Sequence, residues 1–259
     1  MPPQTDQWIS KVERACERFA QKHAFTYNRS EREISASFEI GCFHSLVEFY
    51  EKSCTVAPQN LRDGAYRYLT TPNGNPANFS FVEIAHAQGV FFLRQQVRIK
   101  SHIDPDIAFT PDMVVLKGSS SIDAVKDRDY ASGKRSFFTV SSADVIAAHE
   151  CKSMNPFPEL LVSFIGHLTA AHEWLESADW KKAIAADGVH LAPTLFVGGT
   201  ARGLHLRMIR ALEKTFPVNI LVGMHAGNWK LAKAPNTLVR LAIGIIPPVK
   251  RDITGPILE

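Results

Sequence analysis

The stretch Ala147-Ala-His-Glu-Cys-Lys-Ser-Met154 places an acid and a base at the end of the apolar run Val145-Ile-Ala-Ala148. The apolar run predicts a buried strand. Burying an unpaired charge is costly, so Glu150 and Lys152 need partners. Because side chains alternate along a strand, these two residues share one face while Cys151 points to the other. We therefore expect the partner on a neighbouring strand, at the same edge of the sheet.

A second stretch, Pro111-Asp-Met-Val-Val-Leu116, offers such a partner, because it places a carboxylate directly before another apolar run. If the two strands are neighbours, Asp112, Glu150 and Lys152 converge at the sheet edge. Carboxylates a few ångströms apart repel each other unless a cation lies between them, and Mg²⁺ or Mn²⁺ accepts such oxygen ligands. A lysine beside the cation can orient or deprotonate a water, or stabilise charge on a phosphate.

The motif "PDMVVL" followed by "HECK" resembles the PD-(D/E)XK nuclease superfamily, whose fold is called restriction-endonuclease-like. The resemblance covers about residues 31–225 and implies a core of helix, three strands, helix and strand (αβββαβ). It also implies that Asp112 and Glu150 bind the metal, with the backbone carbonyl of Cys151 as a third ligand. Lys152 would be the catalytic lysine.

The family often adds a carboxylate from its first helix, which corresponds here to a helix predicted over residues 31–52. Glu39 is the expected residue, with Glu48 as the alternative. They are nine residues apart, about 900° around a helix, so they face opposite ways and cannot both serve. The gap between Asp112 and Glu150 is 38 residues, which predicts a polar excursion from the fold at about 117–144.

The order of predicted elements favours an α/β fold with a central mixed sheet flanked by helices. Strands and helices alternate after residue 145, which is typical of parallel pairing in that half. An amphipathic helix is expected at residues 6–24, and the whole chain, 1–259, is expected to be a single domain. Strands are predicted at 79–85, 90–99, 107–116, 145–154, 191–197 and 218–224, the first two forming a hairpin around residues 87–89.

The composition favours a cytoplasmic protein. The formal net charge is +3, which neither requires nor excludes a polyanionic partner. The four cysteines are scattered, without a metal-binding or disulfide pattern, as in a reducing compartment. The N-terminus lacks the order of a signal peptide, and no apolar run reaches membrane-spanning length, so no membrane association is expected.

Two groups of basic residues are candidates for contacts with a nucleic-acid backbone. Arg94, Arg98 and Lys100 alternate on one face of the strand predicted at 90–99. Arg202 lies within the turn "GGTARG". The helix predicted after this turn carries Arg207 and Arg210. Solvated faces are the more common fate of such residues.

Several alternatives compete for individual residues. His149 and Cys151 share a strand face, so a nucleophilic Cys–His pair is a further hypothesis, although core packing is the usual fate of such a cysteine. The turn "GGTARG" is a weak candidate for a phosphate-binding loop of a nucleotide enzyme, because it lacks the full motif spacing. Asp106 competes with Asp112 as a ligand, although Pro105 before it favours a turn residue there. His167 is expected at the surface or as a capping residue.

The expected function is metal-dependent endonucleolytic hydrolysis of phosphodiester bonds in DNA, in restriction, repair or defence. RNA remains an alternative substrate. The alternative from another class is a non-catalytic nucleic-acid-binding or assembly module with the same fold. No separate DNA-reading domain is evident, so specificity would come from segments 58–78 and 117–144, from a homodimer, or from a partner subunit.

Overall fold

The main sheet of the molecule is mixed. The computed structural model describes residues 4–22, 34–72, 74–104, 106–125, 137–172 and 189–226. The seven strands of the main sheet lie in the order β1 (Thr55–Gln59), β2 (Phe81–His86), β3 (Gly89–Gln95), β6 (Met113–Lys117), β9 (Val145–Lys152), β10 (Thr194–Val197) and β11 (Asn219–Leu221). Neighbouring strands from β1 to β9 in this order are antiparallel, and β9, β10 and β11 are parallel to one another.

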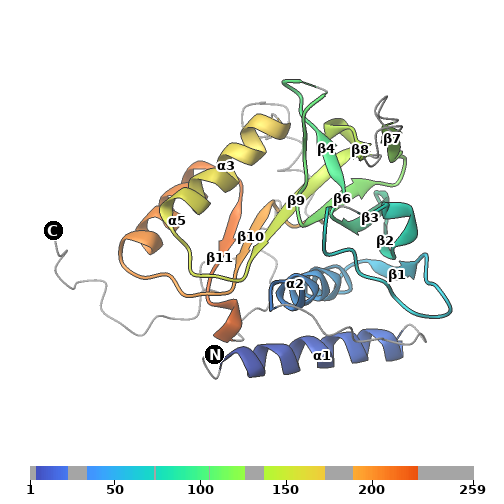
Figure 1. Ribbon diagram of the computed structural model, residues 1–259, viewed down its shortest axis with the longest axis horizontal. Helices are drawn as coiled ribbons and strands as arrows, with labels where there is room; N and C mark the ends of the chain where they lie inside the picture. Colours follow the sequence, from blue (N-terminus) through green and yellow to red (C-terminus); the bar gives the residue numbers. More distant parts are fainter. Residues whose placement is uncertain are drawn as a thin grey trace, which may run out of the picture.

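Helices cover both faces of this sheet (Figure 1). One face carries α2 (Ile34–Tyr50), with α1 (Gln4–Lys22) packed on it, and the other carries α3 (Pro158–His172) and α5 (Leu204–Thr215). The central strand β6 contributes to both cores: Val115 packs in the core beneath α2, whereas Val114 and Leu116 pack in the α3–α5 core. The expected α/β architecture, a mixed sheet flanked by helices, is confirmed.

A second, four-stranded sheet stands beside the main one. Its order is β5 (Ala108–Phe109), β4 (Arg98–Lys100), β8 (Phe137–Val140) and β7 (Asp123–Val125). It is built from two excursions of the chain, one between β3 and β6 and one between β6 and β9. We refer to this sheet as the arm.

The arm corrects two of the predicted strands. The run 90–99 is divided into β3 and β4, and the run 107–116 into β5 and β6, with the two halves of each run in different sheets. The first break falls at Gln96, whose φ of 53° is left-handed and turns the chain out of the main sheet. The polar excursion at 117–144 contributes β7 and β8 to the arm, while residues 126–136 lie outside the described ranges.

Other boundaries differ in detail. The hairpin around residues 87–89 is confirmed, since His86 pairs with Gly89. Strand β1 was not predicted, and its last two residues overlap the segment 58–78. Three short 3₁₀ helices complete the described elements: η1 (Pro76–Asn78), η3 (Ser142–Asp144) and η4 (Met224–Ala226). Within the described ranges, no helix combines the length and apolar character needed to cross a membrane.

Candidate functional site

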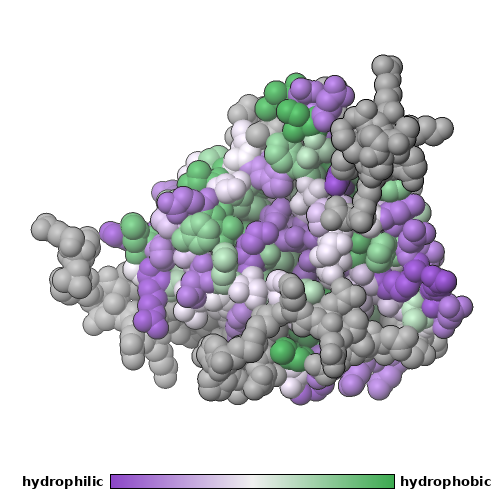
Figure 2. Space-filling model, viewed as in Figure 1, coloured by the Kyte–Doolittle hydropathy of each residue, from purple (hydrophilic) through white to green (hydrophobic). Residues whose placement is uncertain are grey.

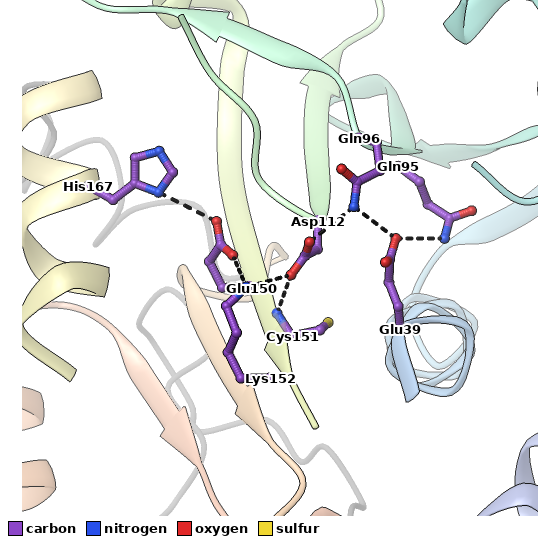
Figure 3. Close-up of polar contacts among 8 residues, drawn as sticks. All are labelled: Glu39, Gln95, Gln96, Asp112, Glu150, Cys151, Lys152 and His167. Carbon is purple, nitrogen blue, oxygen red and sulfur yellow. Dashed lines mark hydrogen bonds and ion pairs between the residues drawn. The ribbon is translucent and has the colours of Figure 1, made fainter. Parts of the chain in front are cut away.

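Asp112, Glu150 and Lys152 meet at one edge of the main sheet (Figure 3). Strands β6 and β9 are antiparallel neighbours, with Met113 opposite His149, so Asp112 lies beside the end of β9. The Lys152 Nζ atom is 3.3 Å from Asp112 Oδ2 and 3.0 Å from Glu150 Oε2. The convergence predicted from the alternation of strand side chains is thereby confirmed.

The residue between the two charges, Cys151, holds Asp112 through its backbone. Its N–H donates to Asp112 Oδ2 at 2.7 Å. Because the N–H and C=O of an extended residue point to the same neighbouring strand, the Cys151 carbonyl also faces the Asp112 side. The thiol points to the opposite face, where it packs against the core that contains Cys42 of α2. The carbonyl, not the thiol, is therefore the group of Cys151 that is directed toward the site.

Glu39 enters the site from α2 and is buried. Its Oε1 atom accepts hydrogen bonds from Gln95 Nε2 at 3.4 Å and from Gln96 Nε2 at 3.2 Å. The same Gln96 Nε2 atom donates to Asp112 Oδ1 at 3.0 Å, so one amide links the two carboxylates. Glu48 faces away, as the helical spacing requires, and forms an ion pair with Arg18 of α1 at 3.0 Å.

Two residues of this network, Gln96 and His167, were not found from the sequence as parts of the site. The Nδ1 atom of His167 on α3 is 3.4 Å from Glu150 Oε1, and its ring packs against Phe109 of the arm. His167 is therefore half-buried beside Glu150, a contact that the expected surface or capping position did not include. For Gln96, the available sequence signal was the polar pair Gln95-Gln96 within the strand predicted at 90–99.

The site opens into a cleft of about 1160 Å³. Its walls come from the start of α2, the loop at 70–72, the arm and the end of β9. The polar or charged side chains that line it include Glu39, Gln96, Arg98, Asp112 and Lys152. Figure 2 shows hydrophilic residues in the middle of this view, beside the more apolar surface of α3 and below the tip of the arm. Charged side chains of both signs therefore line the part of the cleft that adjoins the site.

The carboxylates carry more negative charge than their single ammonium partner offsets. Burial, and then repulsion by Asp112, raises the pKa of Glu39 to about 8. Burial and the charge of Glu150 raise the pKa of Asp112 to about 6. Burial also acts to raise the pKa of Glu150, but hydrogen bonds from His167 and Lys152 outweigh it and lower that pKa. A divalent cation would relieve the excess negative charge at Glu39 and Asp112.

Lys152 remains protonated in this setting. Burial acts to lower its pKa, but the two adjacent carboxylates, Asp112 and Glu150, outweigh burial and raise it above its ordinary value. An ammonium group that keeps its proton can donate hydrogen bonds and supply positive charge. It is a poor general base near neutral pH.

Replacing Glu39 with Gln is expected to stabilise the metal-free protein at pH 8 but not at pH 4.5. The pKa of Glu39 rises from 4.5 to about 8 on folding, so the folded state binds more protons between these values. The free energy of unfolding therefore falls as pH rises through this range, and glutamine removes that loss. We expect a gain of about 4 kcal/mol at pH 8, measured by thermal unfolding in EDTA. An equal effect of the substitution at both pH values would contradict this assignment.

The first basic group does not form one surface. Arg94 lies on β3, and its guanidinium carbon is 3.6 Å from the centre of the Phe81 ring. Arg98 on β4 lines the cleft and donates to the Pro72 carbonyl at 3.4 Å. The Nζ atom of Lys100 is 4.0 Å from the Oδ2 atom of Asp123 on β7. The expectation of one shared strand face is wrong because the chain turns at Gln96, and Arg98 is the member of this group that reaches the cleft.

The second basic group lies near the turn "GGTARG", which follows β10. Arg202 precedes α5, and Arg207 and Arg210 lie on its exposed side. The Gly198 and Gly199 N–H groups donate to the carbonyls of Lys152 and Met154, so both are already engaged by the chain after β9. This use disfavours a phosphate-binding loop.

A glycine is required within this turn because the chain approaches it closely. A Cβ atom on Gly199 would lie 2.7 Å from the Met154 carbonyl oxygen and 2.2 Å from Asn155 Oδ1. Packing against the end of β9 therefore accounts for the glycine, without any ligand.

The remaining alternatives receive no support from the geometry. Neither ring nitrogen of His149, which is fully buried, has a hydrogen-bond partner within the described part of the chain, so no Cys–His pair forms with Cys151. Asp106 is exposed in the turn between β4 and β5, where its N–H bonds to Asp104. It therefore does not compete with Asp112 for the site.

Comparisons with known proteins add no identification. No family model, curated protein or solved structure matches the chain. Across the residues that the structure describes, no three His, Cys, Asp or Glu side chains already surround one point as metal ligands. The Gln96 amide and the Lys152 ammonium instead lie between the carboxylates. Function is therefore inferred from the chemistry of the site itself.

Proposed function

We propose that this protein is a divalent-metal-dependent endonuclease that hydrolyses phosphodiester bonds in DNA. The observation that carries the proposal is the meeting of Asp112, Glu150 and Lys152, from two neighbouring strands, beside an open cleft. Two acids and a lysine in contact are costly to bury, and a catalytic use gives a reason for that cost.

The order of elements around the site supports a restriction-endonuclease-like core. After α2, the strands β3, β6 and β9 form an antiparallel series, and α3 then leads to β10, which is parallel to β9. This succession agrees with the helix, three strands, helix and strand implied by the sequence motif. In the proposed core, β1, β2 and the arm are additions.

The donor set suits Mg²⁺ or Mn²⁺. Glu39, Asp112, Glu150 and the Cys151 carbonyl all offer oxygen, the ligand type that these ions prefer. The raised pKa values of Glu39 and Asp112 reflect negative charge that a cation would offset. When bound, such an ion would supply positive charge at the scissile phosphate and acidify a water molecule.

The side chains around this position have separable roles. Lys152, kept protonated by its two carboxylate partners, would donate a hydrogen bond to the attacking water or to a phosphate oxygen. The Cys151 N–H fixes the orientation of Asp112, and His167 fixes that of Glu150. Arg98, on the wall of the cleft, would pair with a backbone phosphate of the nucleic acid.

The alternative is a non-catalytic nucleic-acid-binding or assembly module that retains the fold. Such a module has no need for Asp112, Glu150 and Lys152 in mutual contact, which is why the nuclease is favoured. A role in restriction, repair or defence is an expectation from the sequence motif, as is a homodimer or partner subunit for cutting two strands.

The test is a cleavage assay of the purified protein on plasmid DNA and on structured RNA, with Mg²⁺, Mn²⁺ or EDTA. We expect DNA to be cut in the presence of either ion and to stay intact in EDTA. Cleavage of RNA alone would change the substrate class. Tight binding of DNA in EDTA, with no cleavage of either substrate under any condition, would favour the binding module.

A further inference from the structure

Gln96 adopts a backbone conformation that is unfavourable for a residue other than glycine. Its φ is 53°, in the left-handed region, and its side chain is buried between β3 and the cleft. Its N–H donates to the Asp112 carbonyl at 3.1 Å. Residues held in such conformations concentrate at functional sites, where the surrounding structure keeps them in place. In this conformation the Gln96 amide is directed toward the carboxylates of Asp112 and Glu39.

The amide nitrogen occupies the position between those carboxylates. Gln96 Nε2 is 3.0 Å from Asp112 Oδ1 and 3.2 Å from Glu39 Oε1, so each of its two hydrogens serves one acid (Figure 3). An amide N–H₂ is the positive end of a neutral group. It gives both acids a hydrogen bond but does not neutralise them.

We propose that Gln96 is a further ligand of the cation site, through its amide oxygen. This inference rests on the proposed metal-dependent function. The oxygen and nitrogen of a side-chain amide are nearly the same size, so a half-turn about the last side-chain bond exchanges them in place. Oε1 would then stand about where Nε2 stands now, beside Asp112 Oδ1 and Glu39 Oε1.

The distances fit this exchange. Adjacent oxygens around an octahedral Mg²⁺ lie about 3.0 Å apart when each metal–oxygen distance is about 2.1 Å. The present separations of 3.0 and 3.2 Å from Gln96 Nε2 to the two carboxylate oxygens are close to that edge length. The half-turn therefore places an amide oxygen at ligand spacing from each of the two carboxylate oxygens. In the metal-free protein, the same amide keeps the two acids in position.

Gln95 provides a matched control from the neighbouring position. Its Nε2 reaches Glu39 Oε1 at 3.4 Å, and none of its hydrogen bonds given by the structure involves Asp112. Gln95 and Gln96 are both buried. Loss of the Gln95 amide therefore removes a hydrogen bond near the site but not the bridge between the acids.

The test is calorimetric titration of the whole protein with Mn²⁺, comparing wild type, Gln96→Met, Gln96→Gly and Gln95→Met. Methionine keeps the length of the side chain without its amide, and glycine removes the amide while accommodating the positive φ. We expect both Gln96 variants to bind Mn²⁺ at least about tenfold more weakly, and Gln95→Met to stay within about threefold of wild type. Thermal unfolding in EDTA verifies that each variant is folded.

Each outcome decides the inference. Wild-type Mn²⁺ affinity in either folded Gln96 variant would overturn the ligand role and leave the proposed nuclease standing. An equal loss in Gln95→Met would also overturn it, since the effect would then be general loosening of the site. A wild-type protein that binds no Mn²⁺ would overturn this inference together with the proposed metal site.

Discussion

Replacing Lys152 with Met is expected to lower the rate of DNA cleavage about a thousandfold while leaving divalent-cation binding in place. Methionine matches the length of lysine but cannot donate a hydrogen bond or carry charge. The Nζ atom lies 3.3 Å from Asp112 and 3.0 Å from Glu150, so its loss removes the cation that accompanies both acids. The metal-free variant should unfold at a lower temperature, because the two acids then repel each other without compensation.

The measurement is the single-turnover rate on plasmid DNA, together with Mn²⁺ titration of the same preparations. Lys117→Met is the matched control, because Lys117 ends β6 on the exposed surface and donates to the Ala143 carbonyl. It should retain wild-type cleavage. Full activity in Lys152→Met would exclude Lys152 from the chemistry, whereas loss of both cleavage and Mn²⁺ binding would make it a structural support of the metal site.

Much of the site could be predicted from local patterns. Two apolar runs ending or beginning in charged residues predicted two buried strands, and side-chain alternation placed Glu150 and Lys152 on one face. The only further condition was that the strands be neighbours, which the pairing of β6 with β9 satisfies. Helical periodicity showed that Glu39 and Glu48 face opposite ways, although it did not choose between them. These inferences succeed because they depend on geometry within one element.

The parts that were missed depend on contacts between elements. Residues 90–99 look like one continuous strand, and nothing local shows that Gln96 takes a left-handed conformation, since hydrogen bonds to Asp112 and Glu39 fix it there. The same break moved Arg94 and Arg98 into different sheets. His167 could not be assigned because the partner of an α3 side chain depends on which strand the helix covers.

Replacing Asp112 with Asn is expected to abolish cleavage, by about a thousandfold or more, and to weaken Mn²⁺ binding at least tenfold. Asp112 has the most contacts of the acids in the site, since it accepts from the Cys151 N–H, the Gln96 amide and the Lys152 ammonium. Asparagine can still accept from the Cys151 N–H, so the fold should survive. The metal-free variant should be at least as stable as wild type at pH 8. Burial and the charge of Glu150 raise the pKa of Asp112 from 3.8 to about 6 on folding. Wild type therefore loses stability as pH rises through this interval, and the charged carboxylate opposes folding at pH 8.

Asp106→Asn is the control for this substitution, since Asp106 lies one strand earlier in an exposed turn. It should cleave DNA and bind Mn²⁺ as wild type does.

Comparison of Asp112→Asn with Lys152→Met then separates two kinds of contribution. If Asp112 holds the cation and Lys152 acts on the water or phosphate, only the aspartate variant loses Mn²⁺ affinity, although both lose cleavage. Retention of wild-type Mn²⁺ affinity in Asp112→Asn would place the cation elsewhere and remove the main support for a nuclease at this sheet edge.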